Sequence, residues 1–395
     1  MIQKTTLWTS EFRLILLVTF LFYFALQLLT GAFPTFMTEK TGSPILGGLM
    51  TTSFMLAAII IRPLYSIFIG TKHLKVSLLL TLTVIFISLI CSINEDGVRL
   101  LTGLRILEGM GFGVVTTLLA TIATRLIPHD RIGEGIGYFG MSTSLGTILG
   151  PMMGLVLLNQ FSFFVLLLII SGVIIVSGLL ICFIHVQDNS TNRSADLPLK
   201  SSWIEGFFDK RVILPSFLVM LFYGTYSSIV NFISSFGEEV HLRKYVPLFY
   251  VVIALMIVLI RPIAGKIYDQ AGHAGLIYGG GVSGIIGLIV LSQADHVFPL
   301  VSAAILYGAT YSIMQPTFQS WAISEVQESK KGTANAMILS GMDLGMALGS
   351  PLLGNVAFAS TYSTMYLLSS LLIVMLIVVY RLKHNHLPRR KIAED

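Results

Sequence analysis

Long apolar runs separated by short polar segments make up most of the chain. A membrane-spanning helix needs about 20 mostly apolar residues. The runs that reach this length lie at 13–37, 45–70, 74–93, 98–127, 133–159, 162–184, 212–237, 244–269, 273–293, 298–325, 331–357 and 362–383. Membrane strands are excluded, because an unpaired edge in lipid leaves backbone groups unsatisfied and no barrel-like alternation over roughly ten residues occurs. The pattern predicts an all-α membrane protein with twelve transmembrane helices.

The composition narrows the class further. Of the 395 residues, 54% are hydrophobic and 11% are charged, whereas a soluble domain carries about 25% charged residues. This excludes a cytosolic enzyme, a nucleic-acid-binding protein and a disordered chain. The run at 13–37 is too long for the apolar core of a signal peptide and lacks a clear cleavage site, so it predicts the first span.

Basic residues lie mostly in the segments that share a side with the N-terminus. Those segments hold eighteen Lys and Arg, whereas the opposite ones hold only Lys40, Arg99, Arg243 and Lys244. Because cytoplasmic loops are enriched in Lys and Arg, both termini are expected in the cytoplasm, with the chain in the plasma (cell) membrane. The net charge of +5 is therefore a topology signal, and no nucleic-acid partner is expected.

The longest polar stretch follows the sixth span and divides the chain into halves. The expected units are an N-terminal six-helix bundle at 1–184, a cytoplasmic linker at 185–211, a C-terminal six-helix bundle at 212–383 and a cytoplasmic tail at 384–395. Within the linker, a capping-box pattern at 202–205 followed by two phenylalanines predicts a short amphipathic helix on the inner membrane surface.

The two halves repeat each other at an offset of 199 residues. Residues 61–63 and 260–262 both read Ile-Arg-Pro, and 145–150 match 344–349 at their Leu and Gly positions. Two parallel repeats joined by a cytoplasmic linker are typical of two-bundle secondary transporters. On these features the chain resembles a twelve-helix member of the major facilitator superfamily over residues 13–383. The resemblance implies alternating access around a central substrate site.

A loop signature of that superfamily, G-x-x-x-D-[RK]-x-G, has a similar segment in the second half. It begins after Arg261 and contains Gly265, Asp269 and Gly272, while the first-half copy lacks both the glycine and the aspartate. An acid here complements the positive N-terminus of a helix in the other bundle. We expect Asp269 to hold that side of the protein shut against the helix that starts near Gly133. A solvated loop acid is the alternative.

Two acids lie deep in the predicted spans. Asp343 is about 12 residues, or roughly 18 Å, from the inner end of its helix, and Glu108 lies at a similar depth. The repeat places Ser144 and Tyr307 at the corresponding positions, so neither acid is inherited symmetrically. Because desolvation favours a protonated carboxyl, both acids are expected to couple transport to protons, together with Arg105. A purely structural pair between Arg105 and Glu108 is the alternative.

The span at 133–159 contains Gly146, Gly150, Pro151 and Gly154. This G-x-x-x-G-P-x-x-G pattern resembles that of superfamily members that exchange substrate for protons, which implies export. Small residues at this spacing let helices approach closely and proline kinks them, so the bundles are expected to rock along this seam.

The remaining candidates concern the cavity and the gate. Arg62 and Arg261, in the inner third of their helices, are expected either to snorkel to lipid headgroups or to pair across the bundle interface. The superfamily's cavity is lined by the first, fourth, seventh and tenth helices, so the resemblance implies a substrate cavity that includes Tyr23, Gln27, Tyr223, Tyr226, Asn231, Tyr307, Tyr311 and Gln315. Aromatic rings with a few amides suit amphipathic ligands with polar or cationic groups.

Chemistry of other kinds finds little support. Cys91 and Cys182 lie near opposite membrane faces, too far apart for a disulfide, and are expected to be buried free thiols. No histidine lies deep in a span, and neither a phosphate loop nor H-E-x-x-H occurs. No metal, cofactor or enzymatic activity is therefore expected.

These observations predict an exporter of small amphipathic molecules that is driven by proton exchange and works by alternating access. Its expected partners are a small-molecule substrate, protons and the lipid bilayer, and a monomer already forms a complete pathway. Two alternatives stay open: a dedicated exporter of a polar metabolite such as a siderophore, with Arg105 holding a carboxylate, and a proton-coupled uptake symporter.

Overall fold

The computed structural model describes residues 6–42, 44–68, 74–93, 95, 97–184 and 208–384. This part of the chain holds twelve long helices: α1 (Ser10–Thr41), α2 (Pro44–Phe68), α3 (Leu74–Cys91), α4 (Val98–Leu126), α5 (Ile132–Gln160), α6 (Phe163–Cys182), α8 (Lys210–Glu239), α9 (Val246–Ala271), α10 (Ala274–Ser292), α11 (Val297–Ser324), α12 (Lys331–Ala359) and α13 (Tyr362–His384). Three 3₁₀ turns, η1 (His129–Arg131), η2 (Arg243–Tyr245) and η3 (Glu328–Lys330), join neighbouring helices.

The helices have the length and composition of membrane spans. Eleven are long and apolar enough to cross a bilayer, and α2 has a shorter apolar segment, Leu49–Tyr65. The all-α transmembrane architecture predicted from the sequence is thereby confirmed. Several helices run beyond the predicted apolar runs, and α1 continues to Thr41, because helical hydrogen bonding does not stop where the hydrocarbon ends.

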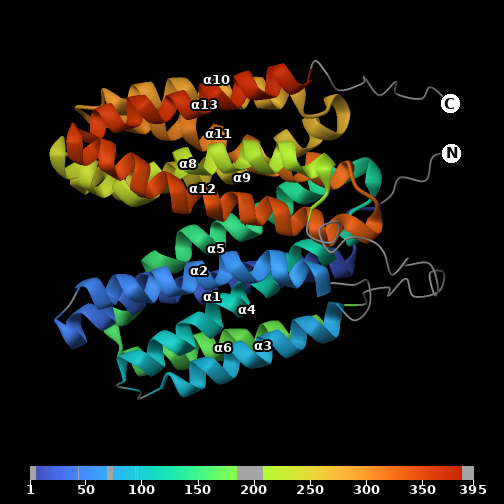
Figure 1. Cartoon of the computed structure of the whole chain (residues 1–395), viewed down its shortest axis with the longest axis vertical. Helices are drawn as coiled ribbons and strands as arrows, with labels where there is room; N and C mark the ends of the chain where they lie inside the picture. The colour runs from blue at the N-terminus through green and yellow to red at the C-terminus, as the bar shows by residue number, and fades with distance from the viewer. Residues whose placement is uncertain are drawn as a thin grey trace.

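The helices form two six-helix bundles side by side, α1–α6 and α8–α13 (Figure 1). The bundles meet where α5 packs on α9 and α2 packs on α12, with further contacts of α4 with α12 and α5 with α11. The α2–α12 and α5–α9 contacts are related by the internal repeat. The start of α1 and the end of α13 lie at the same end of the bundles (Figure 1), which is called the terminal face below.

The outer helices turn apolar side chains away from the protein. Leu80 on α3 and Leu179 on α6 are more than half exposed, as expected for side chains that face lipid. Cys91 and Cys182 end these two helices, and both are exposed free thiols. The expectation of buried thiols was therefore wrong, because each lies on the flank of its helix that faces outward.

The glycines of the exporter-like pattern lie inside the first bundle. A Cβ on Gly146 or Gly150 would contact the α1 residues Tyr23 or Gln27, and one on Gly154 would collide with the carbonyl of Leu28. The expectation that this surface forms the seam between the bundles was wrong. Instead, the glycines bring α5 close to α1 within one bundle, which fits association of membrane helices through small residues.

The second bundle begins at a capped helix. Asp209 precedes α8 and accepts hydrogen bonds from the Arg211 backbone at 3.0 Å and from its guanidinium at 2.7 Å. These bonds hold the pKa of Asp209 below its ordinary value. Residues 202–207 of the predicted amphipathic helix, and most of the predicted linker and tail, lie outside the described residues.

The α1–α5 contact predicts a measurable difference between two glycine substitutions. Gly154→Ala forces a methyl group against the Leu28 backbone and should lower the free energy of unfolding by about 1–3 kcal/mol. Gly172→Ala on α6 has open space around the new Cβ and should leave the melting temperature of the detergent-solubilised protein unchanged or slightly higher. Equal melting temperatures for the two variants would contradict the packing described here.

Candidate functional site

A buried arginine on α2 joins three helices from both bundles. Arg62 is 2% exposed and forms an ion pair through Nη1 with Oδ2 of Asp343 on α12. Nη1 also donates to the Leu339 carbonyl at 3.3 Å, and Nη2 donates to Thr116 Oγ1 on α4 at 3.2 Å. Of the two roles expected for Arg62, pairing across the interface is therefore the one observed, and the side chain does not snorkel.

Asp343 is less deeply buried than the arginine with which it pairs. The Asp343 side chain is 22% exposed, against 2% for Arg62. A guanidinium fits a carboxylate through several fixed N–H groups. Protonation of Asp343 removes the charge that holds α12 to α2 and leaves Arg62 with two neutral acceptors.

The repeat places a second arginine in closely similar surroundings. Arg261 on α9 is fully buried. Its Nη2 donates to Gln315 Oε1 at 2.5 Å, and its guanidinium lies 5.3 Å from the centre of the Tyr311 ring. Arg62 contacts the repeat-related residues Thr116 and Phe112 in the same way. Like Arg62, Arg261 lies inside the protein and does not snorkel.

An acid at the end of α9 caps a helix of the other bundle. Asp269 accepts hydrogen bonds from the backbone N–H of Gly133 at 2.5 Å and of Glu134 at 2.9 Å, where the helix dipole of α5 is positive. Gly133 and Gly265 lie so close that a Cβ on either would collide with the other's carbonyl. Gly272, at φ 73°, then ends α9. Asp269 thus lies where the sequence analysis expected it, against the start of α5.

A buried lysine at the start of α12 contacts the C-terminal end of α4. Lys331 is 2% exposed, and its Nζ donates to the Thr124 carbonyl at 2.8 Å, where the dipole of α4 is negative. Asn335 donates to Thr124 Oγ1 at 3.2 Å. Sequence analysis missed these residues, since the first-half motif copy lacks its acid and no pattern marks the lysine that serves in its place.

A second buried ion pair lies within the first bundle. Arg105 donates to Glu108 Oε2 at 2.7 Å, and the Ser88 hydroxyl lies 3.4 Å from Oε1. The guanidinium is 4.9 Å and 4.4 Å from the ring centres of Phe33 and Phe54. All these partners belong to α1–α4. The geometry favours the structural alternative for this pair.

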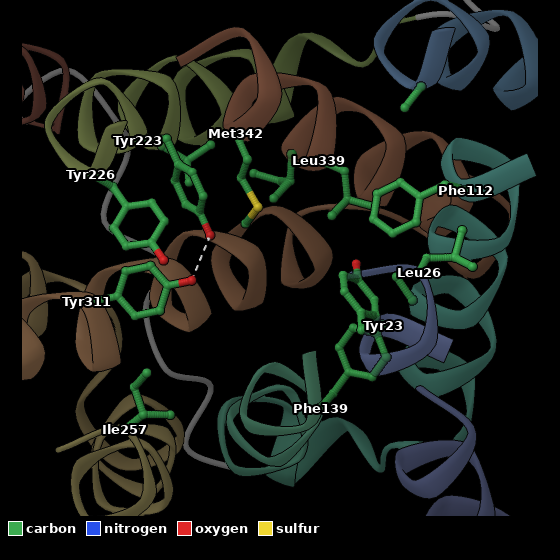
Figure 2. Packing of buried hydrophobic residues seen from close by; sticks show 14 of the residues in the cluster. Tyr23, Leu26, Phe112, Phe139, Tyr223, Tyr226, Ile257, Tyr311, Leu339 and Met342 are labelled. Atoms are coloured by element: carbon green, nitrogen blue, oxygen red, sulfur yellow. Dashed lines mark hydrogen bonds between the residues drawn. The ribbon is translucent and has the colours of Figure 1, made fainter. Parts of the chain in front are cut away.

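The predicted cavity residues fall into two groups on opposite sides of the interface. Figure 2 shows Tyr223, Tyr226 and Tyr311 on one side, and Tyr23 and Phe112 of the first bundle on the other. Among the three tyrosines, the hydroxyls of Tyr223 and Tyr311 lie 3.4 Å apart, and the ring centres of Tyr226 and Tyr311 lie 4.6 Å apart. We call these three side chains the tyrosine cluster.

The other candidates lie around these groups. Tyr307 shares a 2.8 Å hydrogen bond with Thr225 and is fully enclosed in the second bundle. Asn231 donates to the Ser227 carbonyl of its own helix, and Gln27 packs beside Gly150 on α5. These three therefore support the helices around the centre, whereas the tyrosine cluster, Gln315 and Tyr23 lie at it.

The hydrogen bonds and ion pairs between the bundles named above all lie in the half of the structure nearest the terminal face. They join residues near the ends of α2, α4 and α9 to residues near the starts of α5 and α12. The arrangement is that of a two-bundle protein closed on one side, with a charged pair and a set of aromatic side chains above the closure.

Comparison with known sequences now decides the family. The sequence model of the Major Facilitator Superfamily matches residues 15–350 and 279–395. The chain belongs to the Major Facilitator Superfamily. It is therefore a membrane transporter of small molecules and not an enzyme.

Some individual relatives are distant in sequence but match nearly the full length. The staphyloferrin B transporter of Staphylococcus aureus is 21% identical over 93% of both chains. The structure of the fucose:proton symporter FucP of Escherichia coli is 16% identical, covers 94% of this chain and 98% of that one, and gives a TM-score of 0.76. A bacterial homologue of the iron transporter ferroportin, in an outward-facing state, is 11% identical over 95% and 100% of the two chains, with a TM-score of 0.75.

The Asp269 contact predicts the accessibility of the closed side. With Cys91 and Cys182 replaced by Ser, a cysteine placed at buried Ser320, beside Gly133 and Gly265, should react slowly with a maleimide. Asp269→Asn should raise the labelling rate of the purified protein roughly tenfold, because an acid at a helix N-terminus contributes up to about 2 kcal/mol. The matched control is Asp295→Asn, which removes the charge of an exposed acid in a loop. An unchanged rate in Asp269→Asn would refute the role of this contact in closure.

Proposed function

We propose that this transporter exports small amphipathic molecules across the cytoplasmic membrane in exchange for protons, with the terminal face in the cytoplasm. The observation that carries the proposal is the ion pair between Arg62 and Asp343, since it places a titratable group on the contact that closes one side. The excess of Lys and Arg on the terminal side supports the orientation. The glycine pattern from Gly146 to Gly154 supports export.

The proposed cycle starts from the closed terminal face. A proton arriving from the outside binds Asp343, and the interface then contains the charge of Arg62 without its partner. Separating a buried ion pair by removing one member costs about 3–5 kcal/mol. The closed state loses this stabilisation, and the bundles separate at the terminal face.

The size of this effect explains why substrate is also needed. Moving an equilibrium from 1:99 to 99:1 takes about 5.5 kcal/mol, which is more than the loss of one ion pair supplies. Protonation therefore brings the two states near balance, and release of the proton together with binding of substrate from the cytoplasm completes the exchange. We therefore expect no proton transport in the absence of substrate.

Glu108 and Arg105 take a supporting role in this proposal. Their partners all lie in the first bundle, so protonation of Glu108 changes no contact between bundles. Arg105, paired with Glu108 and enclosed by Phe33 and Phe54, is not placed to hold a substrate carboxylate. We assign the proton to Asp343.

Two rival functions use the same ion pair. The similar FucP is a fucose:proton symporter, and an Arg–Asp pair at the interface serves uptake equally well in physical terms. The staphyloferrin B transporter favours a dedicated metabolite exporter. Both remain alternatives to the broader export proposed here, and transport direction separates the first from it.

Proton exchange provides the test. Everted vesicles with an acid-inside gradient should release protons on addition of a transported compound from a panel of lipophilic cations and carboxylate-rich chelators. Asp343→Asn should abolish this release, because the neutral side chain neither binds a proton nor holds Arg62, whereas Glu108→Gln should retain most of it. Full proton release in Asp343→Asn, with normal expression, would refute the assignment, and protons moving with the compound would establish symport.

A further inference from the structure

The internal repeat gives both arginines similar surroundings, with an aromatic ring and a polar side chain at corresponding positions. At the repeat offset of 199 residues, Arg62 corresponds to Arg261, Phe112 to Tyr311 and Thr116 to Gln315. In each half the arginine lies over the corresponding aromatic ring and donates to the corresponding polar side chain. The repeat is therefore preserved in three dimensions around both guanidinium groups.

The carboxylate is the part that differs. Asp343, which neutralises Arg62, corresponds to Ser144, which offers Arg261 no charge. The Ser144 hydroxyl lies 3.4 Å from the Tyr311 hydroxyl. Within the described residues, Arg261 forms no ion pair, and its Nε and Nη1 have no hydrogen-bond partner although the side chain is fully buried.

The two acids nearest in role are already engaged. Asp343 pairs with Arg62 and Glu108 pairs with Arg105, so these groups contribute no net charge. Arg261 adds an uncompensated positive charge where the bundles meet. A buried charge in a membrane protein is expensive and normally marks a functional position with a specific partner.

We propose that Arg261 binds the anionic group of the transported molecule, and that the substrates are organic anions with an apolar, aromatic-compatible body. This inference rests on the transport role proposed above and specifies its substrate class. It replaces the expectation of cationic ligands, because an unpaired guanidinium repels them.

The surroundings of Arg261 fit an oxyanion on an apolar body. The unpartnered N–H groups on Nε and Nη1 can each donate a charge-assisted hydrogen bond to an oxyanion. A Cβ on Gly140 would lie 2.8 Å from Arg261 Nη1, so the absence of a side chain at this position lets the guanidinium lie directly against α5. The hydroxyls of Tyr311 and Ser144 add neutral donors, and the tyrosine cluster provides ring faces for the rest of the molecule (Figure 2).

Binding by the purified full-length protein tests the proposal without a proton gradient. The probes are aromatic monocarboxylates, led by 2-naphthoate, each compared with its primary amide and with the matching ammonium compound, in gluconate buffer. We expect at least one carboxylate to bind about tenfold or more tightly than its amide. Arg261→Gln should abolish this preference, and Arg261→Lys should retain part of it because the charge remains.

A pair of substitutions at Ser144 separates charge from shape. Ser144→Asp supplies the missing carboxylate, should pair with Arg261 as Asp343 pairs with Arg62, and should weaken carboxylate binding about tenfold or more. Ser144→Asn has nearly the same shape without the charge and should bind far more tightly than Ser144→Asp. Equal melting temperatures of the two Ser144 variants would show that weaker binding by Ser144→Asp comes from its charge and not from misfolding.

Three results would overturn the inference: equal binding of every carboxylate and its amide, an Arg261→Gln variant that keeps the preference, or Ser144 variants that bind alike. Chloride that displaces the carboxylates at equal concentration would show an inorganic anion site instead. Asp343→Asn should still bind the carboxylate probes. Full proton release by Asp343→Asn would therefore count against the proposed coupling, whereas equal binding of carboxylates and amides counts against the substrate class alone.

Discussion

The ion pair between Arg62 and Asp343 is the contact on which the closed arrangement of the two bundles depends. It is buried on the arginine side, links α2 to α12, and draws α4 in through Thr116. The neighbouring contacts between the bundles use helix ends: Asp269 lies at the positive end of α5, and Lys331 lies at the negative end of α4. Those contacts hold the face together, and in the function proposed here the pair with Asp343 makes its closure depend on a proton.

Function in this transporter appears where the repeat is broken. The two halves share a scaffold of helices, glycines and Arg-Pro segments, which gives two equivalent interfaces with equivalent arginines. A carboxylate pairs with one arginine, and a serine occupies the corresponding position of the other half. In the function proposed here, Asp343 beside the first arginine binds the proton and the second arginine binds a substrate anion, so the two bundles take on different roles where the repeat differs.

The helices and one contact were predictable from sequence for physical reasons. The thickness of the hydrocarbon layer sets the minimum length of an apolar run that can span it, so the twelve spans can be found from the lengths of the apolar runs in the sequence. The Asp269 contact with Gly133 was predictable because a motif acid next to a helix start involves the local dipole. By contrast, the Arg62 pair with Asp343 joins distant helices, and which faces meet there is not encoded in any local pattern. The predictions of which way Cys91, Cys182 and the α5 glycines face were wrong for a related reason. Helices that are apolar all round carry no signal of which side faces lipid.

The most direct test of the central claim is the distance across the terminal face as a function of pH. His129 and Glu328 are exposed and lie on opposite bundles. Spin labels at these two positions report the distance by pulsed electron paramagnetic resonance. Replacing His129 also removes a competing titratable group. The account predicts a short distance at alkaline pH, a growing population of longer distances as the pH falls, and a longer, pH-independent distribution in Asp343→Asn. A distance that stays short at every pH, or that responds to pH equally in Asp343→Asn, would contradict it.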